Sequence, residues 1–219
     1  MARNLYLILH KKTKTMKKVT KTRNQILAVA SELFKNFGFD KTSIDDIARE
    51  AHKAKRSIYN HFAGKEELFA IIIGNEIAEV RTSLQPILDD TERPAVDRLK
   101  EYMIRRMELI SHAENYQQMM RNEIGHAFDQ RFDNIRQLCR DFDEWERTQF
   151  KRIAADGASR RFAPDFNIDA FADMLLMVLK GLEISFFVQK NYAKYAATFS
   201  TFVGCVVGSL IEQNKQKQL

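Results

Sequence analysis

Hydrophobic residues recur every three or four positions along most of the chain, which is the spacing of one face of an α-helix. The pattern predicts a first helix from Thr20, ended by Gly38, which can adopt a left-handed cap. Two short helices follow, near 43–51 and 55–62, and longer helical segments continue to about residue 211. Residues 5–9 alone resemble a strand. We therefore expect an all-α protein of about nine helices.

The two short helices have different characters. Ser43 can cap the first of them, with Asp46 three residues further on as in a capping box. In the second, Ile58 and Phe62 share a face that can be buried, and the opposite face holds Lys55, Arg56, Tyr59 and Asn60. Such a pair is typical of a helix-turn-helix, whose second helix enters the major groove of DNA. By geometry alone, an ordinary core hairpin is an equal alternative.

Positive charge is concentrated in the first third of the chain. Residues 1–66 carry a net charge of +9 and the remainder −3, which gives the formal total of +6. A basic segment beside a near-neutral body is typical of proteins that bind nucleic acid or another acidic surface. A solvated basic face without a partner is the alternative. Residues 1–19 form a lysine-rich extension, which we expect to be a disordered arm.

Residues 26–68 match one family pattern in register. The matching positions are Ile26, Ala30, Leu33, Phe34, Gly38, Phe39, Thr42, Ser43, Ile47, Ala48, Ala51, Ile58, Tyr59, His61, Phe62, Lys65, Glu66 and Leu68. The pattern resembles that of the tetracycline-repressor (TetR) family of bacterial transcription regulators. This resemblance implies a DNA-binding domain at 20–66 and a helical ligand-binding and dimerisation domain at 67–219. Met16 begins a sequence more typical of the family, so residues 1–15 could instead reflect the choice of start codon.

The resemblance also implies which residues contact DNA. Family positions that touch the DNA backbone are matched by Thr42, Tyr59, His61 and Lys65, and those that enter the groove by Lys55, Arg56 and Ser57. Asn60 shares the outward face, and the charge of Lys53 in the turn could be compensated by a phosphate. For Tyr59 and His61, packing beneath the helix is the alternative. Arg56 replaces a residue that is usually small, and because arginine can bind guanine O6 and N7 we expect it to read sequence.

The turn between the short helices departs from the family pattern. His52 stands in place of a glycine that can adopt a positive φ. Ala54 stands in place of a serine suited to cap the recognition helix. We therefore expect a strained turn and a recognition helix without a side-chain cap.

The body of the chain shows no set of catalytic residues. Glu123 and His126 have Glu-x-x-His spacing, but a di-iron bundle needs that motif twice. We expect no enzymatic activity, no metal and no cofactor. An all-helical enzyme, or a carrier of lipids or small molecules with an incidental basic hairpin, is the alternative function.

The resemblance implies an effector pocket among the central helices and a homodimer. Candidate pocket residues are Met103, Met107, Met119, Met120, Phe128 and Trp145, for which simple core packing is the alternative. The last two helices have broad apolar coverage, which indicates a partner surface, with Phe202, Gly204, Val206 and Gly208 as candidates. A two-fold dimer would bind a double-stranded DNA operator of the same symmetry, with half-sites about 34–36 Å apart.

Few cysteines and the lack of an apolar stretch of bilayer length predict a cytoplasmic protein without a membrane partner. We therefore expect a sequence-specific transcriptional regulator, a repressor that a small, largely hydrophobic effector releases from its operator.

Overall fold

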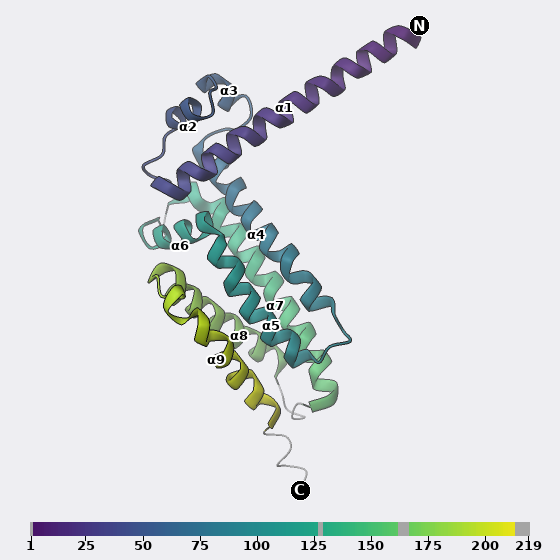
Figure 1. Ribbon diagram of the computed structural model, residues 1–219, viewed down its shortest axis with the longest axis vertical. Coiled ribbons are helices and arrows are strands. Elements are labelled where there is room, and N and C mark those ends of the chain that lie inside the picture. Colours follow the sequence, from purple (N-terminus) through teal and green to yellow (C-terminus); the bar gives the residue numbers. More distant parts are fainter. Residues whose placement is uncertain (1, 127–128, 162–166, 213–219) are drawn as a thin grey trace. The chain divides into compact units, whose positions relative to one another are not determined.

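A computed structural model of the chain describes residues 2–126, 129–161 and 167–212 (Figure 1). Every regular element in these ranges is helical, which confirms the predicted all-α class. No helix among them is both long and apolar enough to span a bilayer. The chain divides into two compact units, Met1–Ile73 and Gly74–Leu219. The boundary falls within one helix, α4 (Lys65–Asp89).

The first unit holds α1 (Ala2–Phe37), α2 (Ile44–Glu50), α3 (Lys55–Tyr59) and the first turns of α4. Ile26, Ala30 and Phe34 are fully buried at successive i, i+4 positions of α1. The rings of Phe34, Phe39 and Phe69 form an aromatic cluster with centroids 5.0 to 5.8 Å apart. This core fixes α1 against the start of α4 and leaves one side of α3 free.

The N-terminal helix differs from the prediction in two ways. It begins at Ala2 and not near Thr20, so the segment expected to be a disordered arm, including the strand-like residues 5–9, is helical. No glycine or proline interrupts Ala2–Phe37, so the backbone has no local reason to leave the helix. Helical spacing also predicts Phe37 on the apolar stripe, but this residue is 61% exposed because the buried stripe runs through Phe34.

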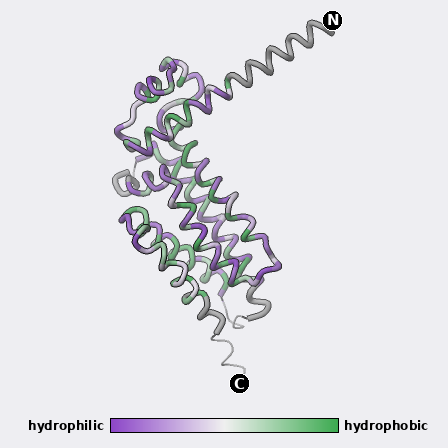
Figure 2. The backbone as a smooth tube through the Cα atoms, viewed as in Figure 1, coloured by the Kyte–Doolittle hydropathy of each residue, from purple (hydrophilic) through white to green (hydrophobic). Residues whose placement is uncertain are grey.

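The second unit is a helical bundle, which we call the body. Its elements after α4 are α5 (Ala95–His112), α6 (Glu114–His126), the 3₁₀ turn η1 (Gln130–Phe132), α7 (Asp133–Arg161), α8 (Ile168–Glu183), the π-helical turn η2 (Ile184–Val188) and α9 (Tyr192–Glu212). Helix α7 packs on α8, and α5 packs on both α7 and α9 (Figure 1). Hydrophobic and hydrophilic residues alternate along these helices, as Figure 2 shows. The apolar positions supply the core of the body.

Helix α4 continues through Pro86 to Asp89. Proline removes one backbone donor, which normally kinks or breaks a helix. Here Leu84 and Leu88, on either side of Pro86, are completely buried. The carbonyl of Leu88 accepts a hydrogen bond from Arg98 Nη1 at 3.0 Å. Burial and this bond hold the last turn of α4 in place.

Candidate nucleic-acid interface

Helix α2 begins with the predicted capping box. The Ser43 hydroxyl accepts from the Asp46 backbone N–H at 3.1 Å, and Asp46 Oδ2 accepts from the Ser43 N–H at 3.1 Å. Hydrogen bonds from Ser43 and Arg49 lower the pKa of the Asp46 carboxyl. Because the cap fixes the first turn of α2, it also fixes the direction in which the chain enters the motif.

The turn between α2 and α3 has the strained backbone that its sequence predicted. His52 has a φ of 52°, in the left-handed region where the family pattern has glycine. The Lys53 N–H donates to the Ala48 carbonyl at 2.9 Å. From α1, Gln25 Nε2 donates to the Ala51 carbonyl at 3.1 Å. These bonds keep the turn tight although a histidine occupies its left-handed position.

Helix α3 has a buried side and an exposed side. Its N-cap is Ala54, which makes no side-chain capping bond, as predicted. Ile58 and Phe62 are buried, whereas the opposite side is exposed and holds Lys55, Arg56, Tyr59 and Asn60. An outward face with two cations, an aromatic ring and an amide matches what a helix needs to contact base edges and phosphates in the major groove.

Other predicted DNA contacts already have partners within the protein. Thr42 is only 3% exposed, and its hydroxyl donates to the Gly38 carbonyl at 2.8 Å. Lys65 Nζ donates to the Phe39 carbonyl at 2.9 Å and lies 4.1 Å from the centre of its ring. Lys55 Nζ lies 2.9 Å from Asp45 Oδ2, which raises the pKa of this lysine. The structure thus separates these anchored side chains from Arg56, Tyr59 and Asn60.

The remaining predicted DNA contacts lie at the edge of the exposed face. Lys53, Ser57 and His61 are half-buried, and the His61 ring lies 6.2 Å from that of Phe62. All nine predicted positions therefore belong to one motif. They differ in exposure and in whether their polar groups already bond to other groups of the protein.

The candidate effector pocket residues are dispersed over three helices. Met103 and Met107 on α5 and Met119 on α6 are buried, and Met120 is half-buried. Trp145 on α7 is half-buried and stacks on Phe142, with ring centroids 5.7 Å apart. Phe128 lies outside the described residues.

Sequence reasoning missed a buried ionic cluster beside these methionines. In this cluster, which we call the ion cluster, charges alternate along Glu146, Arg106, Glu183, Lys180 and Asp143. Arg106 contacts Glu146 through Nε at 2.5 Å and Nη2 at 2.8 Å, and Nη1 lies 2.8 Å from Glu183. Lys180 lies 3.5 Å from Glu183 and 2.6 Å from Asp143. The Tyr102 hydroxyl donates to Glu146. The cluster links α5, α7 and α8 through the interior of the body.

Burial and mutual attraction oppose each other in the ion cluster. Burial alone lowers the pKa of Arg106, but Glu146 and Glu183 more than offset it, so this pKa lies well above its ordinary value. Burial raises the pKa of Asp143 despite the nearby Lys180. A signal for the cluster existed in the sequence. Arg106 stands four residues after Tyr102, and Glu146 four residues before Phe150, so each occupies a core position of its helix.

The candidate dimer residues lie on α9. Phe202 is half-exposed and Gly204 is partly buried, whereas the side-chain surroundings of Val206 and Gly208 lie outside the described part of the chain. More apolar surface is exposed on α8, where Met174 and Met177 are 62% and 65% exposed. Val178, Ile184 and Tyr195 are also exposed. These residues define an apolar face of α8 and α9.

The search for a possible metal site covers the described side chains. Glu123 and His126 lie on α6, but their side chains are outside those described. Among the described side chains, no group of three or more His, Cys, Asp or Glu residues could hold a metal ion.

Comparison with known proteins places the motif in one family. Residues 26–72 match the model of bacterial regulatory proteins, tetR family. The HTH-type transcriptional repressor DhaR of Mycobacterium sp. (strain GP1) is 22% identical over 78% of this chain and 85% of its own. The HTH-type transcriptional repressor KstR2 of Mycobacterium tuberculosis is 26% identical over 69% and 74%. A crystal structure of FadR from Bacillus subtilis with stearoyl-CoA has a TM-score of 0.65 at 14% identity, over 85% of this chain and 96% of that one, a likeness of fold alone.

A helix-turn-helix with an exposed basic recognition helix, followed by a helical body, defines a DNA-binding transcriptional regulator. The match over residues 26–72 and the relatives identify the family. Residues 26–72 therefore form a DNA-binding domain of the TetR type.

Proposed function

We propose that this protein is a dimeric repressor that leaves a two-fold symmetric DNA operator when a small effector binds to its body. The observation that carries the proposal is the exposed side of α3, where Lys55, Arg56, Tyr59 and Asn60 lie opposite the buried Ile58 and Phe62. DhaR and KstR2, which resemble the chain over most of its length, are both named repressors.

The residues of the motif have different roles in this proposal. Lys55, Arg56 and Ser57 enter the major groove, and Tyr59, Asn60, His61 and Lys53 contact the backbone beside it. Lys55 must exchange Asp45 for DNA, a small cost because both side chains are at least half-exposed. Thr42 and Lys65 position the motif through their bonds to the Gly38 and Phe39 carbonyls, and phosphate contacts at these residues are secondary.

The first experiment is a titration of the purified protein with the promoter region beside its own gene. A random duplex of equal length is the control, and both are measured at two salt concentrations. A large preference for the promoter region supports specific recognition, and a steep salt dependence supports phosphate contacts. Equal binding to both duplexes contradicts an operator at that promoter. A lack of binding at either salt concentration contradicts the regulator and favours the carrier or enzyme.

A substitution of Arg56 tests whether this residue recognises a base pair of the operator. Arg56→Ala should lose about 1–3 kcal/mol of binding free energy on the operator and relax the preference at one base pair. Arg105→Ala, at an exposed position of α5, is the matched control and should bind like the wild type. An equal loss on operator and random DNA would show that Arg56 contacts phosphate.

The apolar face of α8 and α9 supports a homodimer. Met174, Met177 and Val178 are exposed at neighbouring positions of one helix, a contiguous arrangement that marks an interaction surface. Met177→Lys should shift the protein from dimer to monomer in sedimentation velocity, because a buried interface would enclose an unpaired charge. Thr148→Lys on α7 controls for the added charge. A dimer that persists in Met177→Lys would place the interface elsewhere.

The effector site in this proposal lies among Met103, Met107, Met119, Met120, Phe128 and Trp145. The FadR complex with stearoyl-CoA supports a ligand with a long apolar part. Release requires that the effector bind the DNA-free state more tightly than the DNA-bound state. The coupling is reciprocal, so DNA must weaken effector binding by the same factor. Screening small molecules for release of labelled operator identifies the effector, and a compound that strengthens DNA binding would refute release.

A further inference from the structure

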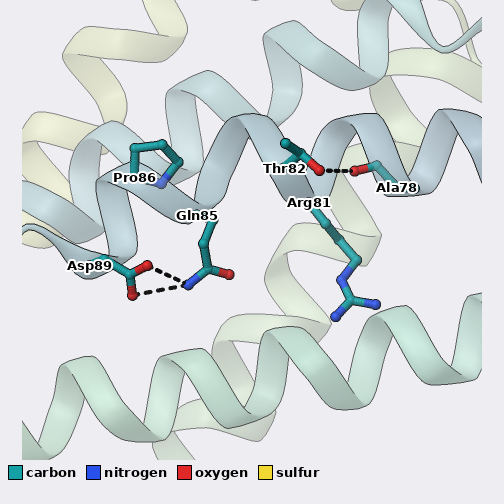
Figure 3. Close-up of a pocket in the computed structure, with 6 residues that line it drawn as sticks. All are labelled: Ala78, Arg81, Thr82, Gln85, Pro86 and Asp89. Atoms are coloured by element: carbon teal, nitrogen blue, oxygen red, sulfur yellow. Dashed lines mark hydrogen bonds between the residues drawn. The ribbon is translucent and has the colours of Figure 1, made fainter.

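A groove of about 550 Å³ runs along α4 in the body, and none of the residues that line it is a candidate effector residue (Figure 3). Its lining residues all belong to one face of α4. They are Ala78, Arg81, Thr82, Gln85, Pro86 and Asp89. The volume falls within the range of sites for small molecules, about 300–1,000 Å³.

Helix α7 contacts α4 at both ends of this groove. At one end, the Arg81 guanidinium lies 4.9 Å from the centre of the Trp145 ring. At the other, Arg152 Nη2 lies 2.8 Å from Asp89 Oδ1. Arg81 and Asp89 are eight residues apart, which corresponds to about 12 Å along a helix. The groove therefore suits an elongated molecule.

The charge of the groove is positive. The negative charge of Asp89 is compensated by its ion pair with Arg152, and Gln85 Nε2 donates to its two oxygens at 3.0 and 2.9 Å (Figure 3). These contacts lower the pKa of the Asp89 carboxyl, so it stays ionised and paired. Arg81, by contrast, has no carboxylate within ion-pair distance among the described residues. In the described part of the chain, its charge lies against the face of Trp145.

The wall between the two ends offers few hydrogen-bond donors. Pro86 has no backbone N–H. The Thr82 hydroxyl donates to the Ala78 carbonyl at 2.8 Å, so its proton is used within the helix (Figure 3). Pro86 and Ala78 add apolar surface. This part of the groove suits an apolar chain better than a polar one.

We propose that the groove binds a small organic carboxylate, with the carboxylate on Arg81 and the apolar chain along Pro86. A guanidinium that stacks on an aromatic face keeps its N–H edge free for a bidentate contact with a carboxylate. None of the groove's lining residues is a candidate effector residue, and the two proposed sites share only Trp145, whose ring lies against Arg81.

Trp145 provides a direct assay, because it is the only tryptophan in the chain and lies against Arg81. Titration of the full-length protein with octanoate should change the tryptophan fluorescence saturably. Arg81→Met should weaken this binding at least tenfold. Arg105→Met is the matched control, since Arg105 is an exposed arginine of α5 paired with Glu108, and should bind like the wild type. Circular dichroism verifies that both variants are folded, and isothermal titration calorimetry measures affinity without relying on Trp145.

Two further probes separate charge recognition from apolar adsorption. Octylammonium and octanol have the same chain length without the negative charge, and the proposal expects both to bind at least tenfold more weakly than octanoate. Equal binding of all three probes would overturn the proposal, as would octanoate affinity that Arg81→Met leaves unchanged. A lack of octanoate binding to the wild type would also overturn it. Arg81→Lys, which keeps the charge but not the planar fork, should retain part of the affinity.

Discussion

The ion cluster gives the most demanding prediction, the effect of Arg106→Met. Arg106 is fully buried, and its guanidinium contacts Glu146 through two nitrogens and Glu183 through the third. Methionine fills much of the same space but leaves both carboxylates without this cation. Removal of one member of a buried ion pair costs about 3–5 kcal/mol, because the remaining charge stays desolvated. For a chain of this size, that loss corresponds to a decrease in Tm of about 6–20 °C.

The assay is urea unfolding followed by circular dichroism, at one protein concentration so that dimerisation contributes equally in every variant. Arg105→Met is the control at the adjacent, exposed position, and should change the free energy of unfolding by less than about 0.5 kcal/mol. The triple variant Arg106→Met, Glu146→Gln, Glu183→Gln also removes the two unpaired buried carboxylates. It should therefore recover most of the lost stability. A loss below about 1 kcal/mol in Arg106→Met, or a triple variant no more stable than the single one, would refute the reasoning.

Three smaller effects follow from local geometry. His52→Gly should stabilise the protein by up to about 1 kcal/mol in urea unfolding, because glycine adopts the φ of 52° without strain. The gain is limited because glycine also makes the unfolded chain more flexible. A loss of stability would contradict strain at this position. Ala54→Ser should add about 0.5–2 kcal/mol by capping α3, and an unchanged unfolding midpoint would show that serine does not cap there. Glu76 accepts hydrogen bonds from the N–H groups of Asn115 and Tyr116 at the start of α6, yet burial raises the pKa of its carboxyl. The folded state therefore binds this proton more tightly than the unfolded chain, and the stability of the wild type relative to Glu76→Gln should fall as the pH rises from about 4.5 upward. A constant difference between the two proteins over that range would contradict the effect of burial.

Local features of the DNA-binding motif could be predicted from the sequence because they depend on residues close together along the chain. The capping box of Ser43 and Asp46 spans three residues, and the strain at His52 depends on one backbone position. The two faces of α3 follow from helical periodicity, which puts Ile58 and Phe62 on one side. For the same reason, the sequence alone predicts the missing side-chain cap at Ala54.

The roles of Thr42 and Lys65 could not be derived in this way. Both match family positions that contact DNA, but in the structure the Thr42 hydroxyl donates to the Gly38 carbonyl and the Lys65 ammonium donates one of its hydrogen bonds to the Phe39 carbonyl. For Lys65 the partner lies 26 residues away, so the bond depends on how α4 meets the end of α1.

The helical class, the helix-turn-helix and the family resemblance could all be predicted from the sequence, because periodicity, caps and turn residues act over a few positions. Three features depend instead on how the helices pack: α4 continues through Pro86, Arg106 joins Glu146 and Glu183, and Arg81 lies on Trp145. Each of these features joins residues from different helices or depends on burial by them. The energies of these contacts depend on which faces of the helices meet. The spacing of residues along one helix gives no information about the helix that packs against it.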